Sequence, residues 1–414
     1  MKSSLQAFLD ANKETPIHEA YVSLRVPQKM FDHRLGGSVA TLSTAGLEEW
    51  PALQNAQQDI VINKELQCSV AERISADGQV ITPLRLEDLE PIAAKLESLD
   101  CKKICLQFLH AGLFPQHQNQ ARDFFQAKGF EVFCPTGSDN PDETSRWRTH
   151  SLNALAASVF TELKQDLLGI LTTRVADEKI FFLNSKGTLE KSSETQALSG
   201  HLSHLAALAA ASADSKKDYL YLGLEGFYLI HPGQENTHWH SPWGHLELPH
   251  VKFEQLQVHP TQRIDLNSFG RLDFLNTNEG WEPGPMMMGR GQKPTLIDLW
   301  SEHAKLTELE TFADRLVAAG QQRFKNTLFT LSKANGSGSS DLSGLMKGLQ
   351  SLAVQKLVTE VILKKKNAKI QIMGPLSSLF ANGFKKDSQS TVDTQEYGEA
   401  AAIATWGRSL AKAR

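Results

Sequence analysis

The chain has 414 residues, 41% hydrophobic and 22% charged, so it can bury one or two hydrophobic cores and is not of the disordered class. Its formal net charge of −4 excludes the global basic field that drives non-specific nucleic-acid binding. No segment approaches the roughly 18 apolar residues of a membrane-spanning helix, and the first ten residues lack the apolar stretch of a signal peptide. We therefore expect a cytoplasmic protein with neither a nucleic-acid nor a membrane partner.

The region between residues 80 and 135 predicts alternating helices and strands. Apolar residues at helical spacing over 89–99 precede the apolar run 104–109, which indicates a helix followed by a strand. Pro115 can open a second helix that ends near Gly129, and residues 130–134 form another short apolar run. This order is typical of a β-α-β unit, whose two strands should be parallel.

The alternation continues beyond residue 150. A long helix is predicted around 152–168, and buried strands at 180–183 and 219–224 are separated by a helix near 202–211. Pro, Gly, Trp and His accumulate over 231–294, where we expect β-structure and long loops.

The last third of the chain returns to helical patterns. A helix is expected from Ile297 to about Leu331, followed by a Gly/Ser-rich connector at 335–340. A second helix over 342–364 leads to a strand at 369–373, which enters the turn Gly374-Pro375.

Several motifs, in one order, resemble the N-terminal (A-type) part of the hydantoinase/5-oxoprolinase family. They are Gly37-Ser-Val-Ala-Thr-Leu-Ser-Thr-Ala-Gly46, Val70-Ala-Glu-Arg-Ile-Ser-Ala-Asp-Gly-Gln-Val80, Phe108-Leu-His-Ala-Gly-Leu-Phe-Pro-Gln-His117, Arg148-Thr-His-Ser-Leu-Asn-Ala154, Phe182-Leu-Asn-Ser-Lys-Gly-Thr-Leu189, Ser199-Gly200, Pro283-Gly-Pro-Met-Met-Met-Gly-Arg-Gly291 and Pro294-Thr-Leu-Ile-Asp298. The resemblance implies an α/β, actin-like (ribonuclease H-like) ATPase fold with two lobes. It also implies an N-terminal lobe at 1–150, a central lobe at 151–330 with a β/loop insertion at 231–294, and a C-terminal segment at 341–414.

The chain departs from the family where phosphate would bind. Too few residues precede the first motif for the family's opening Asp-x-Gly-Gly-Thr loop, so the fold is expected to be truncated or degenerate at the N-terminus. The second such loop reads Leu222-Gly-Leu-Glu-Gly-Phe-Tyr-Leu229, with Gly223 and Phe227 in place of the acidic residue and the Thr. Glu225 is either a displaced metal ligand or a solvent-facing turn residue. ATP and Mg²⁺, which the resemblance implies, are therefore doubtful cofactors, with Gly226 and Gly374 as weak nucleotide-binding candidates.

A second set of candidates concerns substrate or anion binding. Gly289, Arg290 and Gly291 combine close backbone approach with a guanidinium fork that can clamp a carboxylate or phosphate. The alternative is a sharp surface turn in which Arg290 ties to Asp298. By family position, further candidates near a cleft are Asn153, Asn184, Ser199 and Gly200, which could instead cap helices and turns.

Histidines concentrate between residues 231 and 259. His238 and His240 would project from one face of an extended strand, and His245 could add a third metal ligand. The other interpretation is a set of loop histidines with ordinary hydrogen bonds, and we expect no tightly bound metal.

Two functions remain open from the sequence. The resemblance implies a relative of ATP-dependent hydrolases of cyclic amides such as 5-oxoproline and hydantoins, working with a B-type partner subunit. The altered phosphate loops favour a non-catalytic member that binds a small molecule or serves as an assembly subunit. No catalytic residue is assigned, and whether the protein is an enzyme is left open.

Overall fold

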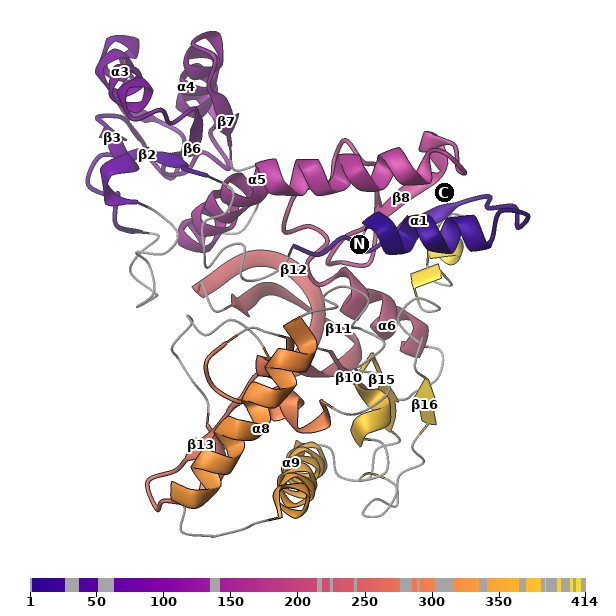
Figure 1. The fold of residues 1–414 in the computed structure, drawn as a ribbon. Helices are drawn as coiled ribbons and strands as arrows, with labels where there is room; N and C mark the ends of the chain where they lie inside the picture. Colours follow the sequence, from indigo (N-terminus) through magenta and orange to yellow (C-terminus); the bar gives the residue numbers. More distant parts are fainter. Residues whose placement is uncertain are drawn as a thin grey trace. The chain divides into compact units, whose positions relative to one another are not determined.

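The computed structural model describes residues 2–26, 37–50, 63–134, 142–213, 218–223, 226–241, 244–275, 285–288, 291–301, 316–334, 341–364, 370–380, 384, 393–395, 403–404 and 407–410. Figure 1 shows the chain as a ribbon. The fold is mixed α/β, with two compact units. Unit 1 comprises Met1–Ala207, Glu235–Val251 and Ile403–Arg414, and unit 2 comprises Leu208–Gln234 and Lys252–Ala402.

Unit 1 contains a four-stranded sheet in the order β3-β2-β6-β7 and a three-stranded sheet in the order β1-β8-β9. Its strands are β1 (Ala20–Val22), β2 (Ala40–Thr44), β3 (Gln67–Val70), β4 (Arg73–Ile74), β5 (Val80–Thr82), β6 (Lys103–Gln107), β7 (Glu131–Phe133), β8 (Ile180–Leu183) and β9 (Leu189–Glu190). Its helices are α1 (Lys2–Ala11), η3 (Lys64–Leu66), η4 (Leu86–Leu89), α3 (Glu90–Ser98), α4 (Gln116–Ala127), α5 (Glu143–Leu171) and η5 (Asp177–Lys179).

The four-stranded sheet is parallel, and it confirms the predicted β-α-β unit as β6-α4-β7. Side chains alternate between its faces because the strand period is two. Ile104 and Leu106 pack with α3 and α4 on one face, where they join a fully buried apolar cluster. On the other face, the Gln107 side chain donates from Nε2 to Ser151 Oγ of α5 at 2.8 Å. The sheet therefore fixes the N-terminal half of α5 relative to its strands (Figure 1).

A buried polar network closes the carboxyl edge of this sheet. Glu72, whose side chain is fully buried, accepts hydrogen bonds from the Thr44 hydroxyl and, at 2.6 Å, from His117 Nδ1. Nε2 of His117 accepts a long bond from the Leu84 N–H at 3.4 Å, which leaves the proton on Nδ1. Leu109 N–H donates to Thr44 Oγ1 at 3.0 Å. The network thus joins the ends of β2, β3 and β6 to the first turn of α4.

Helix α5 confirms the predicted long helix and extends it at its amino end. Asp142 is its N-cap and accepts from Ser145 N–H at 3.1 Å. The expected domain break at residue 150 falls inside this helix. The predicted strand at 180–183 is β8, which pairs in parallel with β1.

Unit 2 is built around a five-stranded sheet in the order β12-β11-β10-β15-β16. The helix before it is α6 (Ser203–Ala213), and the strands of the sheet are β10 (Asp218–Leu222), β11 (Phe227–Ser241), β12 (Gly244–Gln255), β15 (Ile370–Met373) and β16 (Asp393–Gln395). The other elements are β13 (Arg263–Leu266), β14 (Leu272–Leu275), η6 (Met286–Met288), η7 (Leu296–Trp300), α8 (Leu316–Ala334) and α9 (Leu342–Lys364). The far residues of β11 and β12, 235–251, belong to unit 1.

The predicted strands at 219–224 and 369–373 are β10 and β15, which pair in parallel. The predicted helix over 342–364 is α9. The expectation of one helix from Ile297 to Leu331 is wrong at its start, because residues 296–300 form a 3₁₀ turn. Thr295 and Asp298 close that turn as a capping box. Helix α8 begins at Leu316 and runs to Ala334, so the expected break at residue 330 also falls inside a helix.

Within the described residues, no helix has both the length and the apolar character needed to cross a bilayer. The four cysteines, Cys68, Cys101, Cys105 and Cys134, are free thiols. The connector at 335–340 lies outside the described residues.

We expect Glu72→Ala to lower the free energy of unfolding of unit 1 by about 1–3 kcal/mol, because it leaves the buried His117 Nδ1–H and the Thr44 hydroxyl without their acceptor. Denaturant unfolding of the purified variant measures the loss. The matched control is Glu97→Ala, whose carboxylate pairs with Lys102 at 3.0 Å on the surface and is half exposed. That control should change stability by about 0–1 kcal/mol. Equal losses in the two variants would show that the buried network contributes no special stability.

Candidate functional site

A cavity of about 830 Å³ lies in unit 1 against helix α5, within the size range of small-molecule sites. We name it the α5 cavity. It is lined by Arg146, Thr149, His150, Asn153, Asn184, Ser185, Lys186, Glu190, Glu194, Gln196, Leu198, Ser199, Thr237, His238, Glu247, Leu248 and Pro249. Four residues singled out by the sequence, Asn153, Asn184, Ser199 and His238, therefore come together although they lie on separate segments.

Arg146 is the buried cation of this cavity. Its side chain is 3% exposed and forms an ion pair with Glu143, one turn earlier on α5. Glu143 also accepts from His110 N–H at 3.0 Å, which holds the carboxylate in place. Gly112 lies directly against the guanidinium, since a Cβ there would be 2.1 Å from Nη1. The Nε–H of Arg146 is buried and has no hydrogen-bond partner among the described residues.

His150 follows Arg146 by one helical turn. Burial, together with the positive charge of Arg146, lowers the pKa of its imidazole to about 4. The ring is therefore neutral at pH 7 and offers one N–H donor and one nitrogen acceptor. Arg146 and His150 together give the cavity two adjacent hydrogen-bonding groups on one helix face.

Asn153 completes this face, one turn beyond His150. Its Nδ2 donates to Gln196 Oε1 at 3.0 Å, and its Oδ1 accepts from Leu198 N–H at 2.8 Å. These bonds tie the segment after β9 to α5. Asn153 thus positions a wall of the cavity, as the capping alternative allowed.

Asn184 and Ser199 are also held by neighbouring groups. Asn184 Oδ1 accepts from the N–H groups of Lys186 and Thr188 at 3.0 Å, and its Nδ2 donates to Glu190 Oε1 at 2.8 Å. Ser199 Oγ donates to the other oxygen of Glu190 at 2.6 Å. These hydrogen bonds hold the turn after β8 in place and connect it, through Glu190, to Ser199. The polar groups of the two candidates are therefore engaged within the protein.

Among the residues that the structure describes, the histidine candidates do not form a metal centre. His238 Nδ1 pairs with Thr237 Oγ1 at 2.9 Å, and its Nε2 lies 3.8 Å from Asp142 Oδ2. His245 contributes its backbone carbonyl, which accepts from Arg148 Nη1 at 2.7 Å. The side chain of His240 lies outside the described residues. Within the described part of the chain, no group of three or more His, Cys, Asp or Glu side chains is arranged to hold a metal.

The glycine-rich candidates lie elsewhere. Gly289 and Arg290 fall outside the described residues. Gly291 adopts φ +71°, and its carbonyl accepts from Arg323 Nη2 at 2.7 Å. Gly200 allows a close backbone approach, since a Cβ there would be 2.2 Å from Leu24 O. A side chain is thus disfavoured at both positions, by the positive φ at Gly291 and by the contact with Leu24 O at Gly200.

Asp298, the alternative partner for Arg290, is buried and holds its own loop. Its carboxylate accepts from the N–H groups of Met286 at 3.1 Å, Met287 at 2.7 Å and Thr295 at 2.7 Å, and from Thr295 Oγ1 at 2.9 Å. Burial raises the pKa of this carboxyl against the opposing effect of those hydrogen bonds.

The segment that the resemblance matches to a second phosphate loop, 222–229, lies in unit 2 and begins at the carboxyl end of β10. Its Gly223 N–H donates to Gly226 O at 3.0 Å, which closes a hairpin turn between β10 and β11. The end of β15 is adjacent. Gly374 there adopts φ +102°, and a Cβ at this position would lie 2.6 Å from Leu222 O. The two weak nucleotide candidates, Gly226 and Gly374, thus lie at one sheet edge, where ligands often bind parallel strands.

The described residues of this turn do not fit the phosphates of Mg·ATP. The Cβ direction of Gly223 is filled by the Tyr221 ring at 2.5 Å, and that of Gly226 by the Tyr228 hydroxyl at 2.8 Å. Phe227 is fully buried and packs edge-on against Phe380, with ring centroids 5.3 Å apart. Glycines that normally let a backbone approach phosphate here accommodate aromatic rings of their own hairpin.

The sequence reasoning missed Arg146, His150 and Glu143. A signal was present, because residues 146, 150 and 153 are spaced four and three apart and so share one face of a helix. The family-like motif drew attention to Arg148 instead, which lies on another part of the helix and binds the β12 backbone at His245.

Comparisons with known proteins support the fold. No known family model matches the chain. Residues of the chain are 28% identical over 130 positions to "Uncharacterized protein MJ0964" of Methanocaldococcus jannaschii, an alignment that covers 31% of this chain and 19% of that protein. The chain is similar in structure to a nucleotide-free acetone carboxylase, whose description concerns ATP-dependent acetone carboxylation, with TM-score 0.71, 14% identity and 98% of this chain covered.

It is also similar to the ATP-dependent caprolactamase of Pseudomonas jessenii, with TM-score 0.63, 16% identity and 97% of this chain covered. The chain spans 64% of the length of each of these two solved chains. At such identities the likeness shows a shared fold, which agrees with the α/β class expected from the sequence.

We expect the His150 imidazole to remain neutral from pH 8 to about 5. Its folded-state pKa of about 4 lies below the ordinary value of 6.5, so the folded protein binds fewer protons than the unfolded chain between these values. The free energy of unfolding should therefore fall as the pH drops through this range. The decline should be shallower in His150→Gln, measured by denaturant unfolding at several pH values. An NMR titration midpoint between 6 and 7 for His150 would contradict the expectation.

We expect Mg·ATP to bind weakly or not at all, because aromatic rings occupy the space beside Gly223 and Gly226. Calorimetry of the purified chain with ATP and Mg²⁺ measures the affinity. A sub-micromolar dissociation constant, equivalent to about −8 kcal/mol or better, would show that another arrangement of donors receives the phosphates.

Proposed function

We propose that the α5 cavity binds a small neutral carbonyl compound, a cyclic amide above all, and that the chain is a divergent hydantoinase/5-oxoprolinase-family protein of the A-type. The observation that carries the proposal is the charge-compensated row of hydrogen-bonding side chains that α5 contributes to the cavity, Arg146 paired with Glu143 and the neutral His150. The proposed relation is to ATP-dependent hydrolases of 5-oxoproline and hydantoins, within the actin-like fold that the resemblance implies.

The charges of the site favour a neutral ligand over an anion. The guanidinium of Arg146 is balanced by Glu143, and His150 is neutral at pH 7. An incoming carboxylate would meet Glu190 and Glu247 among the lining residues, with only partial compensation from exposed Lys186. A neutral carbonyl oxygen can approach the compensated guanidinium of Arg146 and the His150 ring without that repulsion, because it carries only a partial charge.

The cavity also offers the mixture of groups that an amide ring requires. Leu198, Leu248 and Pro249 supply apolar surface for ring methylenes, while the neutral His150 ring can accept from an amide N–H. The two structural neighbours are an acetone carboxylase and a caprolactamase. Acetone and caprolactam are both small neutral carbonyl compounds. This correspondence supports the ligand class proposed for the present chain.

Binding by itself does not open an amide. Family-type chemistry would phosphorylate the amide oxygen so that water can attack, and the described β10-β11 turn does not fit that use of ATP. The second candidate function is therefore a non-catalytic subunit that binds the same class of molecule, in complex with a B-type partner. The tyrosine-covered glycines of unit 2 favour this alternative.

Titration with caprolactam, hydantoin and 5-oxoproline, followed by ligand-observed NMR, tests the proposal. We expect the two neutral compounds to bind at least tenfold more tightly than anionic 5-oxoproline. His150→Ala should weaken caprolactam binding at least tenfold, or about 1.4 kcal/mol. His18→Ala changes an exposed histidine outside the cavity and should leave binding unchanged.

Tighter binding of 5-oxoproline than of the neutral compounds, or equal affinity in the wild type and His150→Ala, would contradict the ligand class. An assay for the ring-opened product, with and without Mg·ATP, then separates the enzyme from the binding subunit.

A further inference from the structure

The short strand β5 of unit 1 is exposed on both of its faces. Residues 79–83, which include the whole of β5, are exposed one after another, although the side chains of a strand point alternately to opposite faces. Val80 is 51% exposed and Ile81 is 64% exposed. Within the described part of the chain, β5 pairs with β4 alone, so its outer edge has no strand partner there. An apolar strand with an open edge is a template for pairing with another strand.

Further apolar side chains adjoin this edge. Leu86, which begins η4, is 47% exposed, and Leu113 is 58% exposed. The ring of Phe114, the next residue, lies beside the tip of the β4-β5 hairpin, since a Cβ at Gly78 would be 2.6 Å from it. Exposed apolar groups that gather in this way mark interaction sites. We name them the β5 patch, which consists of Val80, Ile81, Leu86 and Leu113.

Strand β5 is held in place at both of its ends. Before it, Ser75 N–H donates to Gln79 O at 2.9 Å, and Gln79 N–H donates to Ser75 Oγ at 3.0 Å. After it, the N–H of buried Leu84 donates to His117 Nε2 at 3.4 Å, which ties the chain to the buried network of Glu72. The edge is therefore preformed, and a strand that pairs with it has little of β5 left to order.

The residues around β5 favour a second copy of this chain as the partner. Asp77 lies four residues before Ile81 and Arg85 lies four residues after it, and both side chains are exposed. If two β5 strands paired antiparallel about Ile81, the Asp77 end of each copy would lie at the Arg85 end of the other. The same pairing sets Val80 opposite Thr82 and Ile81 opposite its own counterpart, and β-branched residues pair favourably across strands. The edge is thus complementary to itself in charge and in side-chain shape.

We propose that β5 is a docking edge for a second copy of this chain, in a two-fold dimer whose β5 strands pair antiparallel about Ile81. The dimer sets the β5 patch of each copy against that of the other and removes apolar surface from water on both. No residue of the β5 patch lines the α5 cavity. The dimer is therefore tested independently of the carbonyl ligand proposed for that cavity.

Sedimentation velocity of the purified full chain, from about 1 to about 300 μM, measures the association. We expect the wild type to shift from monomer to dimer as the concentration rises. Ile81→Lys and Ile81→Glu should each raise the dissociation constant of the dimer at least tenfold, because like charges then face each other at the two-fold axis. The matched control is Leu363→Glu, which changes a leucine of α9 in unit 2 that is 72% exposed and should leave the association unchanged. Circular dichroism of each variant verifies that it is folded.

A mixture of the two charged variants tests the two-fold geometry itself. Equal amounts of Ile81→Lys and Ile81→Glu should associate to within about threefold of the wild type, since opposite charges then meet across the strands. A wild-type chain that stays monomeric throughout would overturn the proposal and leave the β5 patch to a partner of another sequence. Association that neither variant weakens, no recovery in the mixture, or an equal loss in Leu363→Glu would also overturn it.

Discussion

A buried guanidinium must be neutralised and hydrogen-bonded, and in unit 1 this constraint shapes the candidate site. Arg146 reaches Glu143 because residues three apart on a helix are neighbours, and Glu143 is fixed by the His110 backbone. The same requirement explains Gly112, where any side chain would collide with the guanidinium. Once the charge is balanced, the guanidinium brings little net charge to the cavity that it lines. The neutral ligand class that we propose rests on this balance.

The parallel sheet of unit 1 provides the second level of organisation. Its alternating side chains give α3 and α4 an apolar face to cover, while Gln107 on the opposite face bonds to α5. At its carboxyl edge, the Thr44, Glu72 and His117 network unites three of the segments on which the family resemblance depends. These segments therefore have a structural reason to occur together, apart from any chemistry.

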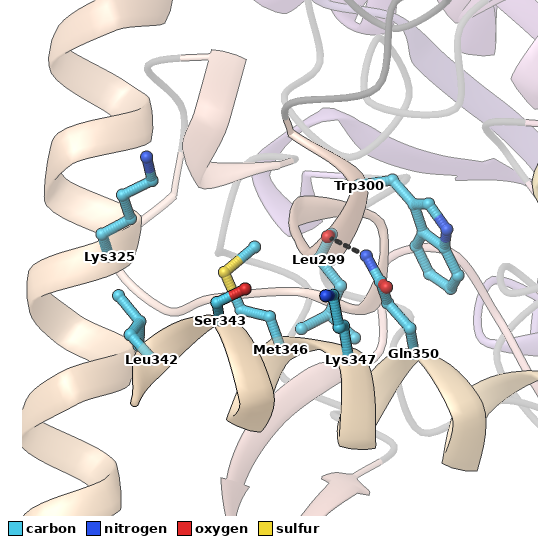
Figure 2. Close-up of a pocket in the computed structure, with 8 residues that line it drawn as sticks. All are labelled: Leu299, Trp300, Lys325, Leu342, Ser343, Met346, Lys347 and Gln350. Atoms are coloured by element: carbon cyan, nitrogen blue, oxygen red, sulfur yellow. Dashed lines mark hydrogen bonds between the residues drawn. The ribbon is translucent and has the colours of Figure 1, made fainter. Parts of the chain in front are cut away.

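Unit 2 uses the corresponding sheet edge differently. The hairpin glycines at positions 223 and 226 lie under tyrosine rings, and Phe227 is part of the core. Aromatic packing therefore dominates the described residues of the hairpin. A cavity of about 480 Å³ in this unit lies instead between α8 and α9, on a base of core side chains (Figure 2).

The sequence by itself determined the order and type of many elements, including β6-α4-β7, α5 and α9, because helical and strand periodicities are local and strong there. It also identified Asn153, Asn184, Ser199 and His238, which the fold brings to one cavity. The sequence could not show which of them are already engaged in hydrogen bonds. Asn184 and Ser199 both donate to Glu190, and the position of Glu190 depends on the turn after β8. Only the tertiary structure decided that Arg146 is buried beside Glu143 and that His150 is neutral in the same cavity, since burial and pairing are properties of the packed chain.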